Sequence, residues 1–202
     1  MKKIFLLSLI LFSSISRADV FNGTTKLSDK SYQDVTINGT ANLQEIKVKK
    51  LNVNGPLQFS NLLVEEDAEV HGPVENSKNG VFVNLKIVGP FSAEKIVCDN
   101  LSVMGAIDVS ELVVKKTMQV TGGINIKHGD IKDLEVNSSH ISLVDSKLSN
   151  LTVNGRKGKE QTLILDKTVI SGDVIFKSGK GIIEMSKDSV VKGKIAGATL
   201  KK

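Results

Sequence analysis

The sequence predicts an all-β fold: a right-handed parallel β-helix (β-solenoid) of about ten turns, with 16–17 residues in each turn. A phrase at residues 51–57, "LNVNGPL", returns as "LKIVGPF" at 85–91, "LSVMGAI" at 101–107 and "LTVNGRK" at 151–157. Apolar and polar residues alternate inside each copy, and this period of two is typical of a strand with one buried face. After the first 18 residues, no stretch shows sustained helical periodicity.

Residues 1–18 are predicted to be a secretory signal peptide, and residues 19–202 a single β-solenoid domain. The chain starts with the basic "MKK", continues with a short apolar run at 4–12, and has small residues, Ser16 and Ala18, at the two positions that a signal peptidase reads. The apolar run is far shorter than the ~20 residues of a membrane-spanning helix. We expect cleavage after Ala18, a periplasmic, secreted or cell-surface product, and no membrane span after cleavage.

The net charge of the predicted mature chain does not indicate a nucleic-acid partner. The whole chain has 27 basic and 22 acidic side chains, and three of the basic ones (Lys2, Lys3 and Arg17) would leave with the signal, so 24 would remain. Both signs are mixed along the chain, and only 4% of the residues are aromatic. Nucleic-acid binding needs a basic face and often stacking aromatics, so it is not expected.

One glycine marks the same place in each repeat. The marked positions are Gly23, Gly39, Gly55, Gly72, Gly89, Gly105, Gly122, Ser138, Gly155, Gly172 and Gly193. Successive positions lie 16, 16, 17, 17, 16, 17, 16, 17, 17 and finally 21 residues apart. A glycine, often after asparagine, is typical of a tight corner that needs positive φ. The last interval contains residues 177–189, which we expect to form a hairpin-like loop or an enlarged turn.

Apolar residues at fixed distances from this glycine predict the inward-facing columns. Four and two residues before it stand Leu51 and Val53, Ala68 and Val70, Leu85 and Ile87, Leu101 and Val103, Met118 and Val120, Leu134 and Val136, and Leu151 and Val153. Two residues after it stand Leu57, Val74, Phe91, Ile107, Ile124, Val174 and Ile195. A second alternating pair is formed by Ile46 and Val48, Leu62 and Val64, Ile96 and Cys98, and Leu112 and Val114. Two or three short strands per turn, joined by polar corners, therefore surround one core.

Stacking is required because one turn alone cannot bury enough apolar surface to offset the entropy of ordering its backbone. Each turn supplies hydrogen-bond partners and an apolar floor to the next. The two ends of the stack are unpaired strand edges, which are templates for another chain. The expected partners are a second copy bound through the end turns and a cell-envelope, glycan or surface partner.

No catalytic, cofactor-binding or metal-ligating residues are predicted. The chain contains no P-loop, dinucleotide-binding, CxxC, HExxH or GxSxG motif. The three histidines are expected in different turns: His71 at a corner, His128 in a polar bend, and His140 in the inward column of the turn where Ser138 replaces glycine. His128 and Asp130 could form an acid–base dyad, but a solvated loop is the preferred interpretation.

The acidic segment at 64–70, "VEEDAEV", could be a cation site or a catalytic cluster. It contains Glu65, Glu66, Asp67 and Glu69. A solvated acidic corner is the preferred interpretation, because polysaccharide-cleaving β-helices have longer turns and large loops, whereas nearly every turn here is minimal. The single cysteine, Cys98, replaces valine in an inward column and is expected to be a buried apolar side chain.

Residues 163–202 resemble the bactofilins, bacterial β-helix proteins that form polymers. The matching residues are the "SGDV" turn at 171–174, the "KGKI" turn at 192–195 and the repeat of about 17 residues. The resemblance implies a parallel β-helix that polymerises end to end without nucleotide and carries no catalytic residues. Bactofilins are cytoplasmic scaffolds, whereas this chain has a predicted export signal.

These observations together predict a non-enzymatic, exported structural, scaffold or interaction protein: a rigid rod that self-associates through its end turns. Two alternatives stay open. One is a cell-surface adhesin with the same rod and a different partner. The other is a carbohydrate-binding or carbohydrate-cleaving β-helix that uses one face as a shallow groove, with Glu65, Glu66 and Asp67 as its first candidate carboxylates.

Overall fold

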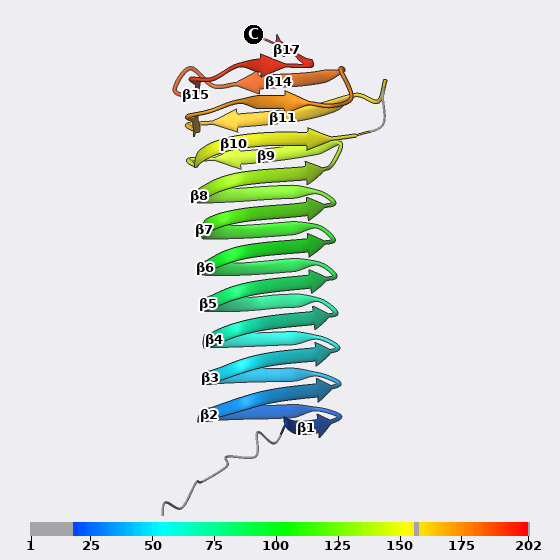
Figure 1. Cartoon of the computed structure of the whole chain (residues 1–202), viewed down its shortest axis with the longest axis vertical. Helices are drawn as coiled ribbons and strands as arrows, with labels where there is room; N and C mark the ends of the chain where they lie inside the picture. The colour runs from blue at the N-terminus through cyan, green and yellow to red at the C-terminus, as the bar shows by residue number, and fades with distance from the viewer. Residues whose placement is uncertain (1–17, 156–157, 202) are drawn as a thin grey trace, which may run out of the picture.

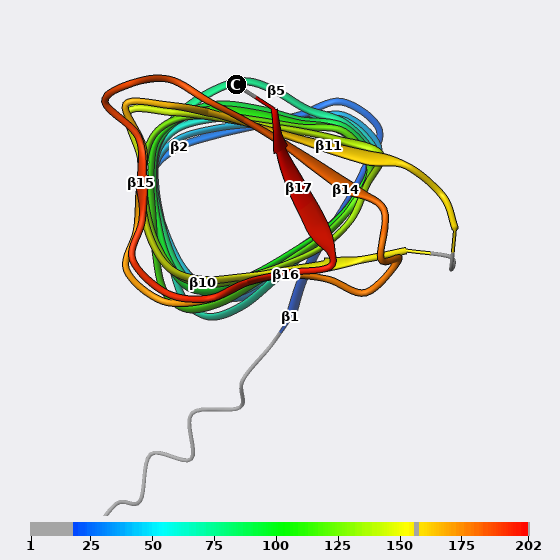
Figure 2. The same cartoon turned by 90° about the horizontal axis from the view of Figure 1, so that it is seen from above.

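The computed structural model describes residues 18–155 and 158–201, and these residues form one parallel sheet wound into a coil of about 11 turns (Figure 1). Seen from the C-terminal end, the chain runs counterclockwise as it rises toward the viewer, so the coil is right-handed (Figure 2). The predicted parallel β-helix is confirmed. Residues 1–17 of the predicted signal peptide lie outside the described residues, so its cleavage stays a prediction. No helix in the described part of the chain is long and apolar enough to cross a membrane.

Long strands bend around the coil in the first two thirds of the chain, and shorter strands follow. They are β1 (Ala18–Asn22), β2 (Thr25–Asn38), β3 (Ala41–Asn54), β4 (Leu57–His71), β5 (Val74–Val88), β6 (Phe91–Met104), β7 (Ile107–Thr121), β8 (Ile124–Asn137), β9 (His140–Val144), β10 (Lys147–Asn154), β11 (Gln161–Asp166), β12 (Val169–Ile170), β13 (Val174–Phe176), β14 (Gly181–Met185), β15 (Val190–Val191), β16 (Ile195–Ala196) and β17 (Ala198–Lys201).

A typical turn has three faces, and each face buries two side chains. In β3, face A (41–44) buries Ala41 and Leu43, face B (46–48) buries Ile46 and Val48, and face C (51–54) buries Leu51 and Val53. Three corners separate the faces. We call them the left-handed corner (Glu45), the third corner (49–50) and the glycine corner (54–56), and a 17-residue turn adds one residue at a corner, as in β4 at 65–67.

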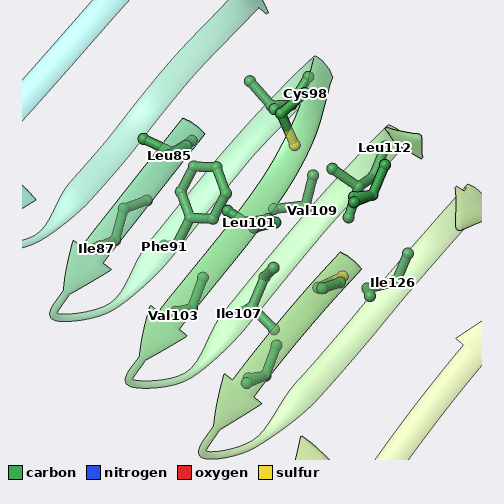
Figure 3. Close-up of a cluster of buried hydrophobic side chains, with 14 of the residues drawn as sticks. Leu85, Ile87, Phe91, Cys98, Leu101, Val103, Ile107, Val109, Leu112 and Ile126 are labelled. Atoms are coloured by element: carbon green, nitrogen blue, oxygen red, sulfur yellow. The ribbon is translucent and has the colours of Figure 1, made fainter. Parts of the chain in front are cut away.

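The inward columns form one continuous core. Leu51, Leu85, Leu101 and Leu151 are all 3% exposed or less, and they belong to a single aligned file that passes through β3 to β10. The other inward residues predicted from the glycine spacing are buried as well, apart from Ile195, which is half-buried near the end of the rod. Figure 3 shows how side chains from successive turns, among them Leu85, Leu101 and Phe91, fill the interior.

The glycine corner explains why glycine recurs in the first two thirds of the chain. From Gly39 to Gly122 each corner glycine has φ between +138° and +157°, and a Cβ added to it would overlap the carbonyl oxygen of the corner glycine one turn below. Only glycine has both the conformational freedom and the space that this close backbone approach demands. Asparagines before the glycines form a ladder: Asn54 donates to Asn38 at 2.8 Å, and Asn38 donates to Asn22 at 3.0 Å.

The left-handed corner was not predicted from the sequence. One residue per turn has φ near +50° there: Asp29, Glu45, Asn61, Asn79, Lys95, Glu111, His128, Asp145 and Lys167. Asparagine and aspartate tolerate this conformation, but Glu45, Lys95 and Glu111 have no such preference. The residues on both sides of each corner, such as Gln44 and Ile46 beside Glu45, pair with the adjacent turns and hold the corner in this conformation.

Two predicted glycine positions are wrong. Gly172 and Gly193 stack on each other, but Gly172 lies beside Asn150 at the third corner, so neither belongs to the glycine corner. Val174 accordingly pairs with Leu151, in the column that precedes the glycine corner in earlier turns. Extra residues between Asn154 and Gln161 cause this slip, because Leu163 aligns with Ile141, 22 residues earlier.

The predicted inward position of His140 is also wrong. Val136 and Ile141 are both buried and lie five residues apart, one more than usual, so the extra residue turns His140 outward. The Ser138 side chain supports this longer corner, accepting from the His140 amide at 3.1 Å and donating to its carbonyl at 2.7 Å.

Residues 177–189 do not form a hairpin-like loop. They contain a corner at 177–180, strand β14, and the next corner at 186–189, and the turn from Leu163 to Ile183 has 20 residues. This segment is therefore part of an enlarged turn.

Buried hydroxyls replace apolar residues in one inward column of the last turns. Ser146, Thr168 and Ser189 accept backbone N–H groups from the adjacent turn.

Candidate functional site

Two columns of polar side chains run along the outside of face C, parallel to the axis of the rod. The first column contains Asp67, Asn84, Asn100, Thr117, Asp133 and Asn150, and the second contains Glu69, Lys86, Ser102, Gln119, Glu135 and Thr152. The residue between the two columns in each turn points into the core, so backbone forms the floor between two polar walls. We call this feature the polar groove.

The first wall of the polar groove is a ladder of amide hydrogen bonds. Asn84 donates to Asp67 at 2.9 Å, Asn100 donates to Asn84 at 2.8 Å, and Thr117 donates to Asn100 at 2.9 Å. Asn150 continues the ladder to Asp133 at 2.8 Å. Because each amide binds its neighbours one turn away, the ladder fixes the side chains and adds cohesion between turns.

The second wall is charged. Lys86 Nζ lies 2.6 Å from Glu69 Oε1, and His71 Nε2 lies 3.0 Å from the same oxygen. The hydrogen bond from Lys86 and then the one from His71 lower the pKa of Glu69. The pKa of Glu135 is lowered mainly by a hydrogen bond from Asn154. Both carboxylates are held in the ionised form, in which they accept hydrogen bonds.

A hollow of about 400 Å³ lies in the polar groove between Asp67 and Gln119, and a second hollow of about 250 Å³ continues from Thr117 to Thr152. The walls offer amides, hydroxyls, one lysine and carboxylates. This donor set can bind an elongated polar ligand by hydrogen bonds. Each of the carboxylates in the walls accepts a hydrogen bond from a neighbouring lysine or amide.

The acidic segment at 64–70, for which a solvated corner was preferred over a cation site, places Glu65 and Glu66 at an exposed corner, where they form ion pairs. Glu65 lies 2.8 Å from Lys47, and Glu66 lies 3.1 Å from Lys49 and 3.5 Å from Lys50. Hydrogen bonding and the charge of Lys49 lower the pKa of Glu66. Among residues 18–155 and 158–201, no group of three or more histidine, cysteine, aspartate or glutamate side chains is arranged to hold a metal ion.

The three histidines lie apart. His128 Nδ1 contacts Asp145 Oδ2 at 2.9 Å, so its partner comes from the next turn and is not Asp130, with which the sequence suggested a dyad. Both His128 and Asp145 are 58% exposed, as expected for a solvated corner. His71 contacts Glu69, and His140 is exposed near Ser138.

Cys98 is buried in an inward column of face B, as predicted. Burial in the apolar core raises the pKa of its thiol to about 12, with a smaller contribution from Asp99. Since the thiolate is the reactive form of cysteine, Cys98 is not a nucleophile at neutral pH.

At the N-terminal end of the rod, the inward columns carry polar and aromatic side chains. Thr25, Leu27, Lys30 and Tyr32 align with Ala41, Leu43, Ile46 and Val48 of the next turn. Lys30 is exposed in the column where Ile46 is buried. Tyr32 packs edge-to-face against Phe21 of β1, with ring centroids 6.4 Å apart.

At the C-terminal end, the inward columns stay apolar except for the one that contains Ser189. Strand β17 inclines across the opening of the last turn (Figure 2). Val191, Ile195 and Ala198 pack against the core, and Leu200 is 55% exposed. The amides of Val190 and Lys192 donate to carbonyls of the turn below at 2.9 Å, so the amide of Val191 between them points to the open edge.

The two terminal turns also differ in charge. Residues 18–34 contain two lysines and three aspartates, a formal charge of −1. Residues 186–201 contain four lysines and one aspartate, a formal charge of +3. The N-terminal and C-terminal turns of the rod therefore carry formal charges of opposite sign.

No protein-family model, curated protein or solved structure matches this chain. The candidate sites therefore depend on the geometry of this molecule. Sequence reasoning found the end turns and named Asp67, which lies in the first wall, whereas Glu65 and Glu66 lie outside the polar groove. The rest of the groove was missed, because it is made by residues 16–17 positions apart whose types differ from turn to turn. The regular spacing of Asn84 and Asn100 was the one signal that pointed to it.

Proposed function

We propose that this protein is an exported, non-enzymatic structural rod that associates end to end through its terminal turns. The observation that carries this proposal is the contrast between the sides and the ends of the rod. Along the sides, backbone groups pair with adjacent turns, whereas each end presents an open strand edge. Open edges of this kind bind another chain by continuing the sheet.

Continuing the inward columns from one copy into the next gives a compatible head-to-tail contact. In the aligned register, Val191 of one copy would stack on Tyr32 of the next, Leu200 on Thr25, and Ser189 on Lys30. Leu200 would lose its exposure, and Lys30 would meet a hydroxyl. The opposite formal charges of the two terminal turns favour this arrangement over contact between two like ends.

The non-enzymatic part of the proposal is supported by the state of the polar side chains. The carboxylates of the acidic segment pair with lysines or an amide, His128 pairs with an exposed aspartate, and the Cys98 thiol is buried and neutral. Export is supported by the predicted signal peptide. Cell fractionation, with sequencing of the mature amino terminus, tests it: a mature protein that begins at Asp19 outside the cytoplasm is expected, and a cytoplasmic protein with Met1 contradicts it.

Sedimentation velocity and electron microscopy of the purified protein test end-to-end assembly. Leu200→Lys should shift the protein to the monomer, because it adds a charge to the apolar C-terminal end. Met104→Lys is the matched control: Met104 is also 55% exposed but lies in the middle of the rod. A strict monomer at high concentration, or equal loss of assembly in both variants, would contradict the proposal.

A second candidate function, glycan binding by a surface rod, is favoured by the polar groove. Its length and its rows of hydrogen-bonding side chains suit a linear polar chain better than a compact ligand. A glycan array with the protein and with Lys86→Ala tests it, with Lys26→Ala on face A as the control. Binding that survives Lys86→Ala and falls with Lys26→Ala would place the ligand elsewhere.

A further inference from the structure

We propose that face B is a second self-association surface, through which two rods pack side by side in opposite directions. This lateral contact differs from the end-to-end contact of the proposed function and does not depend on it. Its occupant is a second copy of this chain.

Face B has one outward-facing residue per turn between its corners, and four successive turns place apolar residues there. The column runs through Lys47, Leu63, Val81, Val97, Val113 and Asp130. Val81 is 46% exposed, and the three other apolar members are half-buried. These outward apolar side chains do not contribute to the core, which lies on the opposite side of the same strands.

The charges at the two ends of this apolar stripe are opposite in sign. Lys47 lies one turn before Leu63, and Asp130 lies one turn after Val113. The column therefore reads positive, four apolar residues, negative along the axis. Such a sequence is self-complementary only when the second copy is inverted.

An antiparallel two-fold arrangement, with its axis between Val81 and Val97, satisfies every position of the column. It pairs Lys47 with Asp130, Leu63 with Val113, and Val81 with Val97, each twice because of the symmetry. A parallel arrangement would place Lys47 against Lys47 and Asp130 against Asp130. Like charges in direct opposition disfavour that alternative.

The two edges of face B agree with the antiparallel arrangement. Along the left-handed corner, Glu45 would face His128 and Asn79 would face Lys95. Along the third corner, Glu65 would face Lys115. Along these edges two like-charge approaches remain. Asp29 would face Asp145, which already pairs with His128 at 2.9 Å, and Lys49 would face Lys132, while Lys49 already has Glu66 as a partner at 3.1 Å.

The size of the surface predicts a weak dimer. From one corner to the other, face B is about 13 Å wide, and the seven steps from Ser31 to Lys147 span about 34 Å, which gives roughly 440 Å² for each copy. A stable interface buries about 800 Å² on each partner. We therefore expect a dissociation constant of about 0.1 mM for two single rods, and a tighter association by many parallel contacts once rods have assembled end to end.

Sedimentation equilibrium of the Leu200→Lys variant, in which end contacts are suppressed, isolates the lateral dimer. Val81→Glu should weaken it by at least about tenfold, because a carboxylate would be buried at the centre of the contact. Asp130→Lys should weaken it about fivefold, and adding Lys47→Asp should restore it by exchanging the two charges. Met104→Glu, which changes an exposed apolar residue outside face B, is the control.

Cross-linking determines the orientation and does not depend on the charge variants. In a Cys98→Val, Leu200→Lys background, Leu63→Cys and Val113→Cys proteins are treated with a short bis-maleimide, separately and mixed. The antiparallel dimer predicts cross-links mainly in the mixture, because the two positions are three turns, about 14 Å, apart on one rod. Cross-links in Leu63→Cys alone at the same yield, absence of cross-links, or a dimer unaffected by Val81→Glu would overturn the proposal.

Discussion

Adding one methyl group at Gly122 should destabilise the rod strongly, whereas adding it to the next residue should not. Gly122 has φ of +142°, and a Cβ on it would overlap the carbonyl oxygen of Gly105 in the turn below. Gly123 lies outside the left-handed region, and a Cβ added to it would meet no atom within 4 Å. Gly122→Ala and Gly123→Ala are therefore matched variants of the same corner.

The expected loss of stability in Gly122→Ala has two sources: the strained backbone conformation and the hydrogen bonds that must lengthen. The strained conformation costs an alanine about 1–3 kcal/mol. Relief of the overlap moves the corner away from Gly105, which lengthens the hydrogen bonds from Gly105 N–H to Thr121 and from Ile107 N–H to Gly123, both 2.9 Å long. At about 1 kcal/mol for each bond, the total loss is about 3–5 kcal/mol. Gly123→Ala should change the stability by less than about 1 kcal/mol, toward stabilisation.

Urea unfolding followed by circular dichroism measures this difference. The Gly122→Ala protein should unfold at clearly lower urea than the Gly123→Ala protein, with both spectra showing strand before unfolding. Equal midpoints for the two variants would refute the reasoning, since they would show that the corner has space that the structure does not contain.

Three further predictions concern the core, the thiol and acid. Leu101→Ala should cost about 3–4 kcal/mol in urea unfolding, because the cavity lies between two fixed turns, and a loss below about 1 kcal/mol would contradict the continuous core. Cys98, whose thiol pKa is raised to about 12 by burial, should resist maleimide at pH 8 until the protein unfolds; labelling as fast as that of a free cysteine would show that the column is open. The pKa values of Glu69 and Glu135 are lowered in the folded state, so their contribution to stability is present above their ordinary pKa of 4.5 and is lost as the pH falls through the lowered values. The thermal stability of the protein should therefore fall below about pH 4.5, and it should fall less in Glu135→Gln. Identical pH profiles for the two proteins would show that Glu135 does not contribute to this pH dependence.

The fold was predictable because the sequence shows two periods, that of the strand and that of the turn. Alternation over two residues, as in Leu51 and Val53, defines the buried side of each face, and the return of glycine after 16 or 17 residues defines the turn. The recurrence of glycine has a direct physical cause at Gly39 to Gly122, where stacked corner backbones leave no space for a side chain.

The assignment of residues after Asn154 to faces and corners was not predictable from the same patterns. All three faces have the same inward–outward–inward pattern, so a shift by one face after Asn154 leaves the alternation unchanged. Gly172 then falls at the expected spacing by coincidence, although it lies at the third corner. The misplacement of His140 has the same origin, because one extra residue at a corner exchanges inward and outward positions.

The candidate surfaces were only partly predictable. The open ends follow from any stacked solenoid, but the polar Lys30 and aromatic Tyr32 at the N-terminal end and the more apolar C-terminal end appear only once the columns are aligned. The polar groove and the apolar stripe of face B consist of outward residues that contact each other across turns. Their partners, such as Asp67 for Asn84, depend on register.

Distances between spin labels along one outward column test the stacked coil most directly. Pairs that join Asn52 to Gln119, Glu135 or Thr152, in a Cys98→Val background, are four, five and six turns apart in the structure. Electron–electron double resonance should give distances near 19, 24 and 29 Å, a rise of about 4.8 Å for each turn. Distances that fail to rise in equal steps, or that rise by much more than one strand spacing per turn, would contradict the parallel β-solenoid.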